Sequence, residues 1–303
     1  MDIINLNRRY STTRMLTKVP PTGKSDSLYL SSHPEQVYQG GLRTQGYFKQ
    51  NYQDKPLLSI ITVVFNSQNY LEQTIVGVLC QSYSNIEYIV IDGASTDSSL
   101  DIVKKYEEQI DYIVSEPDKG ISDAFNKGVK AASGDYYLFL NADDFLVSKD
   151  SIQNAFDILN PKASVHWFRT GFLTMNDRRV YSFNYAFSKR SLYYLRTYPQ
   201  PSTIYRHTVF EQVGDFSLDL KNTMDTEFLI RCATQGVVIV SYPMVISLMR
   251  LGGISGSNIE TTIREGYQIR KKHLGTIPAL IFTIIRRAKQ EVKNSIRYAK
   301  NWL

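Results

Sequence analysis

The stretch that decides the fold is YYLFLNADD at residues 136–144, where a short apolar run ends at two adjacent carboxylates. An apolar run bounded by polar residues is typical of a strand buried on both faces of a parallel sheet. Asp143 and Asp144 would repel each other unless a cation or hydrogen-bond donors satisfy them. Hard oxygen ligands suit Mn²⁺ or Mg²⁺, with a substrate's phosphates completing the coordination shell. Alternatively, one of these residues caps a helix near Ser148 or lies in a solvated turn.

Three similar strands precede this stretch, as apolar runs at residues 58–64, 88–91 and 112–114. Helical spacing and capping residues between the strands predict helices over about residues 69–79, 95–108 and 120–133. Strands that alternate with helices predict an α/β protein with a doubly wound, mostly parallel sheet covered by helices on both faces.

Ligands of such sheets bind beyond the carboxyl ends of the strands, where Asn66, Asp92, Asp118 and Lys119 are expected beside the acidic pair. Asp92 could accept hydrogen bonds from a nucleobase or a ribose, or it could form only an Asp-Gly turn. Asp118 and Lys119 open the third helix, whose N-terminus tolerates an anion while the lysine reaches phosphate. The alternative is a helix cap with a solvated lysine.

Several blocks of this sequence together resemble the family 2 inverting glycosyltransferases of the GT-A fold, of the kind that builds bacterial cell-surface polysaccharide. The resemblance extends over roughly residues 57–275. The blocks are Phe65-Asn66, Ile89 to Asp97, Ser115 to Gly128, Gly134-Asp135, Leu140 to Asp144, Gly214 to Phe216, Met224 to Arg231, and Gly252 to Ser255.

The resemblance implies a role for each matching acid. Asp92 would bind the base of a nucleotide-sugar donor, and Asp118 would line the same pocket. Asp143 would bind the ribose and diphosphate region, and Asp144 would hold the Mn²⁺ or Mg²⁺ ion that bridges the diphosphate. Asp225 matches the catalytic base. The family's metal motif departs here at Asn141, which stands where an acid is common and leaves Asp144 as the one secure carboxylate ligand.

The chemistry supports a separate base independently of the resemblance. A sugar hydroxyl is a poor nucleophile near neutral pH, so a carboxylate must accept its proton, whereas the departing diphosphate needs neutralisation. Asp225 and the acidic pair fit this division, although Asp225 could instead only start a helix over residues 226–233. Arg250, before the glycine-rich residues 252–256, could lie near the diphosphate on a loop that closes over the donor, or it could precede a simple turn.

Charge and composition narrow the function further. The chain has a net charge of +6, but residues 56–275 are slightly acidic and the basic excess lies at the ends, which argues against nucleic acid as a substrate. Residues 1–16 lack the apolar core of a signal peptide, and no apolar run reaches the ~18 residues of a membrane span. Cys80 and Cys232 both lie in apolar segments and are expected to be reduced core residues. These features predict a cytoplasmic protein.

Residues 276–303 carry six basic side chains and one acidic one. Their apolar residues form one helical stripe with basic residues opposite, which is typical of an amphipathic helix on an anionic membrane surface. The protein would then be peripheral on the inner face of the cytoplasmic membrane. The alternative is a helix docked on the protein's own core.

The sequence therefore predicts an N-terminal extension (1–55), a GT-A domain (56–250), and a glycine-rich loop with a helical, basic tail (251–303). The expected function is inverting, non-processive transfer of a sugar, from a UDP-sugar or similar donor, to a hydroxyl of a saccharide or lipid-linked oligosaccharide. Processive relatives carry membrane spans and a Gln-x-x-Arg-Trp block that this chain lacks. A sugar-phosphate nucleotidyltransferase and an inactive carbohydrate-binding scaffold are the alternatives.

Overall fold

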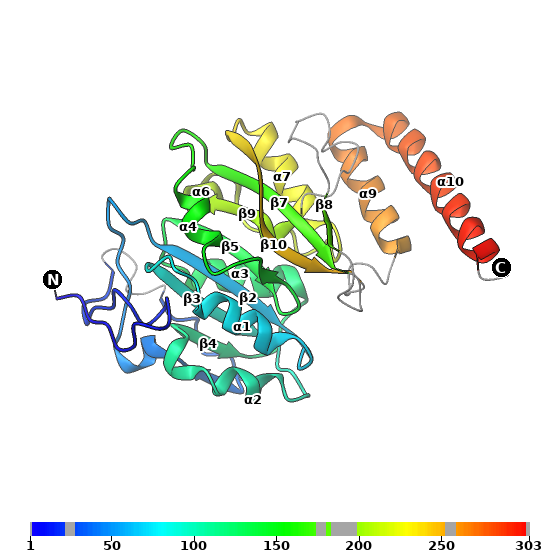
Figure 1. The fold of residues 1–303 in the computed structure, drawn as a ribbon. Coiled ribbons are helices and arrows are strands. Elements are labelled where there is room, and N and C mark those ends of the chain that lie inside the picture. The colour runs from blue at the N-terminus through cyan, green and yellow to red at the C-terminus, as the bar shows by residue number, and fades with distance from the viewer. Residues whose placement is uncertain (1, 22–27, 174–179, 183–198, 252–258, 301–303) are drawn as a thin grey trace.

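The computed structural model describes residues 2–21, 28–173, 180–182, 199–251 and 259–300 as a large mixed sheet between helices (Figure 1). The strands are β1 (Tyr38–Gly40), β2 (Leu58–Val64), β3 (Ile86–Asp92), β4 (Tyr112–Ser115), β5 (Tyr136–Asn141), β6 (Phe145–Leu146), β7 (Val165–Leu173), β8 (Val180–Ser182), β9 (Thr203–Arg206) and β10 (Ile239–Arg250). The α-helices are α1 (Leu71–Leu79), α2 (Ser99–Lys104), α3 (Ile121–Ala131), α4 (Ser151–Phe156), α6 (Thr208–Val213), α7 (Met224–Thr234), α9 (Ile259–Leu274) and α10 (Thr276–Lys300). Short 3-10 turns lie at η1 (Leu42–Gln45), η2 (Glu107–Gln109) and η3 (Gln200–Ser202).

The sheet runs in the order β1-β4-β3-β2-β5-β9-β7-β10-β6, with β8 beside β7. Strands β4, β3, β2 and β5 are parallel, which confirms the fold expected from the four apolar runs. Strand β9 then pairs antiparallel with β5, and β7 pairs antiparallel with β9. The sheet is therefore parallel from β4 to β5 and mixed from β5 to β6.

Strand β2 lies at the centre of the sheet and contributes side chains to two apolar cores, one on each face. Ile61 packs in the core that includes Phe125 of α3, whereas Ile60 packs in the core that includes Ile75 of α1. Because successive side chains of a strand point to opposite faces, a central strand with both faces covered is mostly apolar, and its few polar side chains must be hydrogen-bonded. This requirement explains why the sequence of β2 reads as a mostly apolar run.

Helix α3 approaches the sheet closely because Gly128 faces β2. A Cβ atom at this position would overlap the side chain of Ile61, so the close contact needs a glycine. The packing holds the N-terminus of α3 at the carboxyl edge of the sheet, where the predicted donor residues lie.

Residues 1–55 are more closely joined to the domain than an extension would be. Strand β1 pairs antiparallel with β4 and extends the sheet at its edge. The side chain of Arg43, in η1, forms an ion pair with Glu87 of β3 at 2.6 Å, and both side chains are 2% exposed. Glu87 also accepts hydrogen bonds from Ser59 Oγ and from the backbone N–H of Ser133 at 2.8 Å. The predicted boundary at residue 56 therefore falls inside one packed unit.

We expect Arg43→Met to lower the free energy of unfolding by about 3 to 5 kcal/mol, because it leaves a buried carboxylate without its cation. The matched control is Lys105→Met, which breaks an exposed pair with Glu72 and should cost less than about 1 kcal/mol. Urea denaturation of the two variants measures the difference. Equal losses would mean that the N-terminal segment does not stabilise the domain.

Two details differ from the sequence-based expectations. Cys232 is buried, but Cys80 is exposed, because it follows the last residue of α1 and points away from the core. The helix expected over residues 95–108 is also shorter, since α2 covers only Ser99–Lys104 and a separate turn, η2, follows. In both places, the local apolar pattern was not enough to predict where the helix ends or which side chains are buried.

Helices α9 and α10 lie side by side at one end of the molecule (Figure 1). Helix α9 belongs to the folded body, since Ile263 and Ile269 are buried and Ile269 joins the core beside α7. Among the helices of the described ranges, none is long and apolar enough to cross a membrane.

Candidate active site

The parallel strands bring their carboxyl ends to one edge of the sheet. Their register pairs Val64 with Asp92, Asp92 with Ser115, and Val63 with Asn141, so the chain leaves all four strands at the same level. The segments that follow carry most of the residues predicted to bind a donor. The structure therefore gathers Asn66, Asp92, the 118–119 turn and the 143–144 pair at this edge.

Asn66 joins the ends of β2 and β3. Its backbone is in the left-handed region, with φ of 48°, a conformation that Asn tolerates better than most residues. Its N–H donates to Ser95 Oγ at 2.9 Å, and its Oδ1 accepts from the N–H of Thr96 at 2.8 Å. Asn66 is exposed, and its hydrogen bonds connect the loops that follow β2 and β3. Its contact with a nucleotide-sugar donor stays a prediction.

Asp92 is fully buried at the end of β3. Its carboxylate accepts hydrogen bonds from the N–H of Ser95 at 3.0 Å, from Ser95 Oγ at 2.5 Å and from Ser115 Oγ at 2.6 Å. These contacts hold the 93–97 loop against the end of β4. A direct contact between Asp92 and a base stays a prediction, because the carboxylate faces the loop that it supports.

Asp118 lies at the same edge of the sheet but is less deeply buried than Asp92. A Cβ atom on Gly93 would overlap its carboxylate and come within 3.3 Å of the Phe65 ring, so these three residues adjoin one another. Burial raises the pKa of Asp118, although the N–H of Gly120 donates to it at 2.7 Å. Lys119 is exposed at the start of α3. The Phe65 ring, for which the sequence predicts no separate role, is 55% exposed at this edge.

Asp143 and Asp144 follow β5 directly. Asp144 is 1% exposed, and Asp143 beside it is half-buried. Burial, and then the charge of Asp143, raises the pKa of Asp144 well above its usual range, and burial raises the pKa of Asp143 too. The amide of Asn141 donates to Asp144 at 2.8 Å, and Thr74 Oγ1 donates to the backbone carbonyl of Asp144 at 2.7 Å.

The surroundings of this pair fit a cation. Two carboxylates in a low-dielectric site favour a positive charge between them, as their raised pKa values indicate. Asn141 Oδ1 is buried and accepts no hydrogen bond from the described residues, so a further hard oxygen is available. The described residues contain no group of three acidic, His or Cys side chains that could hold a metal alone. A cation bound here would take its other ligands from water or from a donor's phosphates.

Arg250 ends β10 and lies against the acidic pair. Its backbone N–H donates to Asp144 Oδ1 at 3.3 Å, and its positive charge lowers the pKa of Asp143 against the larger effect of burial. The guanidinium donates to Gln73 Oε1 at 2.5 Å and lies 4.1 Å from the centre of the Tyr70 ring. Gln73 and Tyr70 are therefore neighbours of the site that the sequence did not reveal. The glycine-rich stretch after Arg250 lies outside the described residues.

Asp225 occupies the first turn of α7, on a different element from the acidic pair. Its Oδ1 accepts from the N–H of Thr226 at 2.6 Å, and the side chain is half-buried. Burial raises its pKa to about 6, and the nearby charge of Glu265 adds to the rise. Within the described ranges, no hydrogen bond or ion pair joins Asp225 to Asp143 or Asp144. The structure thus provides two separate acidic positions.

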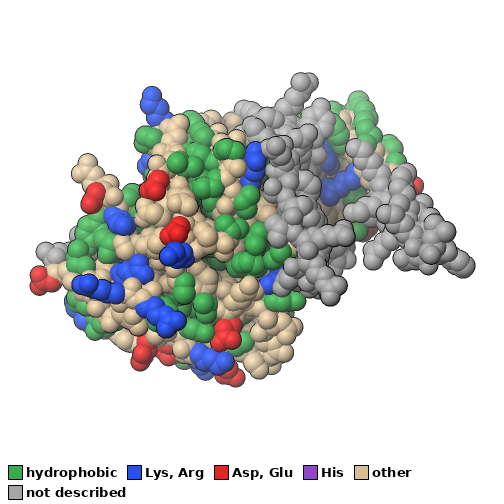
Figure 2. All heavy atoms as spheres, viewed as in Figure 1, with side chains coloured by type: hydrophobic (Ala, Val, Ile, Leu, Met, Phe, Trp, Pro, Cys, Tyr) green, Lys and Arg blue, Asp and Glu red, His purple; other side chains and the backbone are tan. Residues whose placement is uncertain are grey.

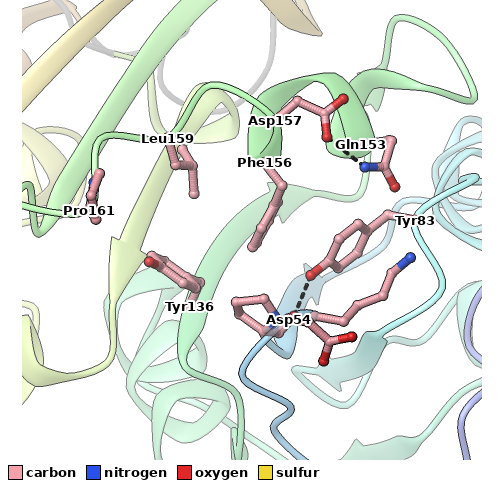
Figure 3. Close-up of a pocket in the computed structure, with 10 residues that line it drawn as sticks. Asp54, Tyr83, Tyr136, Gln153, Phe156, Asp157, Leu159 and Pro161 are labelled. Carbon is pink, nitrogen blue, oxygen red and sulfur yellow. Dashed lines mark hydrogen bonds between the residues drawn. The ribbon is translucent and has the colours of Figure 1, made fainter.

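A cavity of about 220 Å³ lies elsewhere, at the amino ends of the strands (Figure 3). It is lined by Tyr136 at the start of β5 and by Pro56 ahead of β2, with Tyr83 and Phe156 stacked at 4.5 Å. Its position is opposite to the carboxyl edge. This cavity therefore contains none of the predicted site residues.

Comparisons with known proteins show the family to which the chain belongs. The sequence pattern of "Glycosyl transferase family 2" matches residues 59–214, which is more than half of the chain. A PGL/p-HBAD biosynthesis glycosyltransferase of Mycobacterium bovis is 28% identical over 214 residues, covering 68% of this chain and 81% of that protein. The putative teichuronic acid biosynthesis glycosyltransferase TuaG of Bacillus subtilis is 36% identical over 124 residues, covering 40% of this chain and 48% of TuaG.

Two solved structures share the fold. Residues 1–349 of S. aureus TarS, in complex with UDP-GlcNAc, superpose with a TM-score of 0.59 at 21% identity, covering 71% of this chain and 65% of that one. The mannosyltransferase PcManGT of Pyrobaculum calidifontis, in complex with GDP-Man and Mn²⁺, gives 0.58 at 17% identity, covering 78% and 76%. The family resemblance and the predicted fold are both confirmed. By the match over residues 59–214, the chain belongs to glycosyl transferase family 2 and is a glycosyltransferase.

Proposed function

We propose that this glycosyltransferase moves one sugar from a nucleotide-diphosphate donor, a UDP-sugar, to a hydroxyl of a saccharide or lipid-linked saccharide, with inversion at the anomeric carbon. The observation that carries the proposal is the separation of two acidic positions with raised pKa values. Asp143 and Asp144 follow β5 beside Arg250, whereas Asp225 begins α7. A single displacement needs one group for the leaving diphosphate and another for the attacking hydroxyl.

Asp225 is suited to the role of base. A pKa of about 6 leaves the carboxylate ionised at neutral pH, yet makes it a stronger proton acceptor than an ordinary aspartate. Its hydrogen bonds to Thr226 use Oδ1 only, so Oδ2 is free of these contacts and can accept the proton of the sugar hydroxyl. The base would act while the bond from the anomeric carbon to the diphosphate breaks.

The acidic position after β5 would receive the diphosphate. Arg250 supplies a fixed positive charge beside Asp143, and the N-terminus of α3, with Lys119, supplies further positive potential at the same edge. Asp118 and the exposed ring of Phe65 adjoin Gly93, where a base could lie against the sheet edge. Asp144, with Asp143 and Asn141, would hold Mn²⁺ or Mg²⁺, which neutralises the charge that develops on the leaving group.

The relatives support this choice of substrates. TarS was solved with UDP-GlcNAc and PcManGT with GDP-Man and Mn²⁺, so two proteins of similar fold bind nucleotide-sugars. The names of TuaG and of the mycobacterial relative refer to teichuronic acid and to PGL/p-HBAD biosynthesis. We propose by analogy that this chain acts in the assembly of a cell-surface polysaccharide, on the cytoplasmic side.

The experiment that tests the function is a panel of nucleotide-sugars, assayed with Mn²⁺ for release of the nucleoside diphosphate and for transfer to saccharide acceptors. We expect at least one UDP-sugar to bind and turn over. Binding without turnover by any donor would favour an inactive scaffold. Pyrophosphate release from a nucleoside triphosphate and a sugar phosphate would indicate a nucleotidyltransferase and contradict the proposal.

The described part of α10 supports a membrane surface as partner. Several of its apolar side chains are exposed to solvent, and Figure 2 shows hydrophobic side chains on the surface at this end of the molecule. The exposed ones are Ile277, Leu280, Ile281, Ile284 and Ile285, at 45% to 73% exposure. Ala279 is buried and Phe282 lies against Arg270 of α9, so one side of this segment packs on α9 while the stripe of five apolar side chains stays uncovered. Apolar stripes among basic residues favour anionic lipid, since burial and charge attraction then act together.

We expect the protein to float with phosphatidylglycerol vesicles and not with phosphatidylcholine vesicles. Ile284→Asp should weaken flotation by about tenfold, because it places a charge in the centre of the exposed stripe. The matched control is Ile158→Asp, which changes an exposed isoleucine of the body and should float like the unchanged protein. Equal flotation of both variants would exclude α10 as the membrane contact.

A further inference from the structure

A buried glutamate of α9 holds the segment that leads into α7. Glu265 Oε1 accepts from the N–H of Lys221 at 2.8 Å, and Oε2 accepts from the N–H of Asn222 at 3.0 Å and from Thr223 Oγ1 at 2.9 Å. Glu265 is 2% exposed. The three contacts join residues more than forty positions apart in sequence, so they come from tertiary packing and not from the local turn.

This segment determines where α7 begins. Thr223 precedes the helix, and its carbonyl accepts the N–H of Glu227 at 3.0 Å in the first helical turn. Asp225 lies in that same turn, two residues beyond the last contact with Glu265. A shift of the 221–223 segment would therefore move the carboxylate of Asp225.

The opposite side of the same loop is held by α3. Ser122 Oγ donates to the carbonyl of Leu220 at 3.1 Å, and the amide of Asn126 exchanges two hydrogen bonds of 2.9 Å with the backbone of Phe216. Helix α3 starts at the edge where the donor residues lie. The loop before Asp225 is thus fixed between the donor side of the sheet and the C-terminal helix α9.

An ionised carboxylate suits this position better than a neutral group. Glu265 receives three donors with two acceptor oxygens, and charge-assisted hydrogen bonds are shorter and stronger than neutral ones. A glutamine would keep the shape but would point an NH₂ group at one of the N–H donors. That donor would lose its partner in a buried site, and the loop would have to move.

We propose that Glu265 is a positioning residue for the base: it fixes the start of α7 and so aims the Asp225 carboxylate at the acceptor hydroxyl. The inference rests on the proposed role of Asp225. It also gives α9 a part in catalysis, although this helix follows the segment matched to the family pattern. Small displacements of a catalytic group cost much of its effect, because proton transfer needs hydrogen-bond geometry.

The test compares Glu265→Gln with Glu260→Gln, a matched control on the same helix whose side chain is exposed and pairs with Arg287. We expect Glu265→Gln to lower kcat by about tenfold or more, with the donor KM and the Kd for UDP within about twofold of the unchanged protein. Glu260→Gln should change none of these. A parallel loss of kcat and donor affinity would indicate general damage and overturn the positioning role.

The pH profile gives a second measurement that simple loss of structure would not produce. The titratable groups that interact with Asp225 are Glu265 from α9 and Tyr205 from β9. Removing the negative charge of Glu265 removes one cause of the raised pKa of Asp225, so the acidic limb of kcat should move to lower pH. An acidic limb that stays in place with unchanged kcat would overturn the inference.

Thr223→Val keeps the test decisive if Glu265→Gln does not fold. It removes one hydrogen bond to Glu265 and leaves the charge in place, so kcat should fall by a few fold and the acidic limb should not move. Unchanged kcat in Thr223→Val would count against the inference. Absence of any transfer by the unchanged protein would instead refute the proposed function, which separates the two failures.

Discussion

Asp225→Asn is expected to lower the rate of sugar transfer by about 10²- to 10⁴-fold, while the affinity for the nucleotide-sugar stays the same. The amide has the shape of the carboxylate and can keep the hydrogen bond from the N–H of Thr226. It cannot accept the proton of a sugar hydroxyl. The loss should therefore appear in kcat at saturating donor, with calorimetry showing an unchanged Kd for UDP.

The matched control for this variant is Asp219→Asn, an exposed aspartate in the loop before α7. It should keep the full rate of transfer. If Asp225→Asn turns over as fast as this control, Asp225 is not the base.

The same assignment sets a direction for the pH dependence of the unchanged protein. The base must be ionised to accept a proton, and burial raises its pKa to about 6. We therefore expect kcat to be low below pH 6 and to rise to a plateau above it. An ordinary exposed aspartate would give its rise about two pH units lower.

Asp144→Asn has the second large expected effect, a fall in metal-dependent transfer of about 10²- to 10³-fold. The substitution removes the carboxylate that we assign to the cation. The Kd for UDP in the presence of Mn²⁺ should weaken, whereas the Kd without metal should stay the same. Chelation of the metal should bring the unchanged protein down to the level of the variant.

This variant should fold. Without a cation, burial and the charge of Asp143 raise the pKa of Asp144, so the ionised form is unfavourable in the folded state. A carboxyl group with a raised pKa in the folded protein lowers stability as the pH rises from its pKa in the unfolded chain to its pKa in the folded protein. A neutral amide avoids this loss. The Tm of metal-free Asp144→Asn should therefore equal or exceed that of the unchanged protein. Asp157→Asn, on the exposed side of the Figure 3 cavity, is the matched control.

If Asp144→Asn binds UDP with Mn²⁺ as tightly as Asp157→Asn does, Asp144 is not the metal ligand. The cation would then bind elsewhere, or transfer would proceed without it.

The parallel half of the fold could be predicted because its strands are buried on both faces. Such strands are mostly apolar, so β2, β3, β4 and β5 are visible as runs in the sequence. Strands β7, β9 and β1 were not predicted, since their place depends on partners far away in the chain. The exposure of Cys80 was missed for the same reason.

The residues of the site also divide into those that the sequence predicts and those that it does not. The carboxyl ends of parallel strands meet at one edge, so the gathering of Asn66, Asp118 and the acidic pair followed from the strand pattern alone. Gln73 and Glu265 could not be found, because only tertiary packing brings them to Arg250 and to the loop before Asp225. The role of Asp225 itself came from the family resemblance and from the need for a separate base.

The central claim is a single displacement in which Asp225 activates the acceptor and the groups after β5 receive the diphosphate. The anomeric configuration of the product tests it most directly. Proton NMR of the glycosylated acceptor, formed from an α-linked donor such as UDP-GlcNAc, should show the β anomer. An α-linked product would mean retention and would contradict the account.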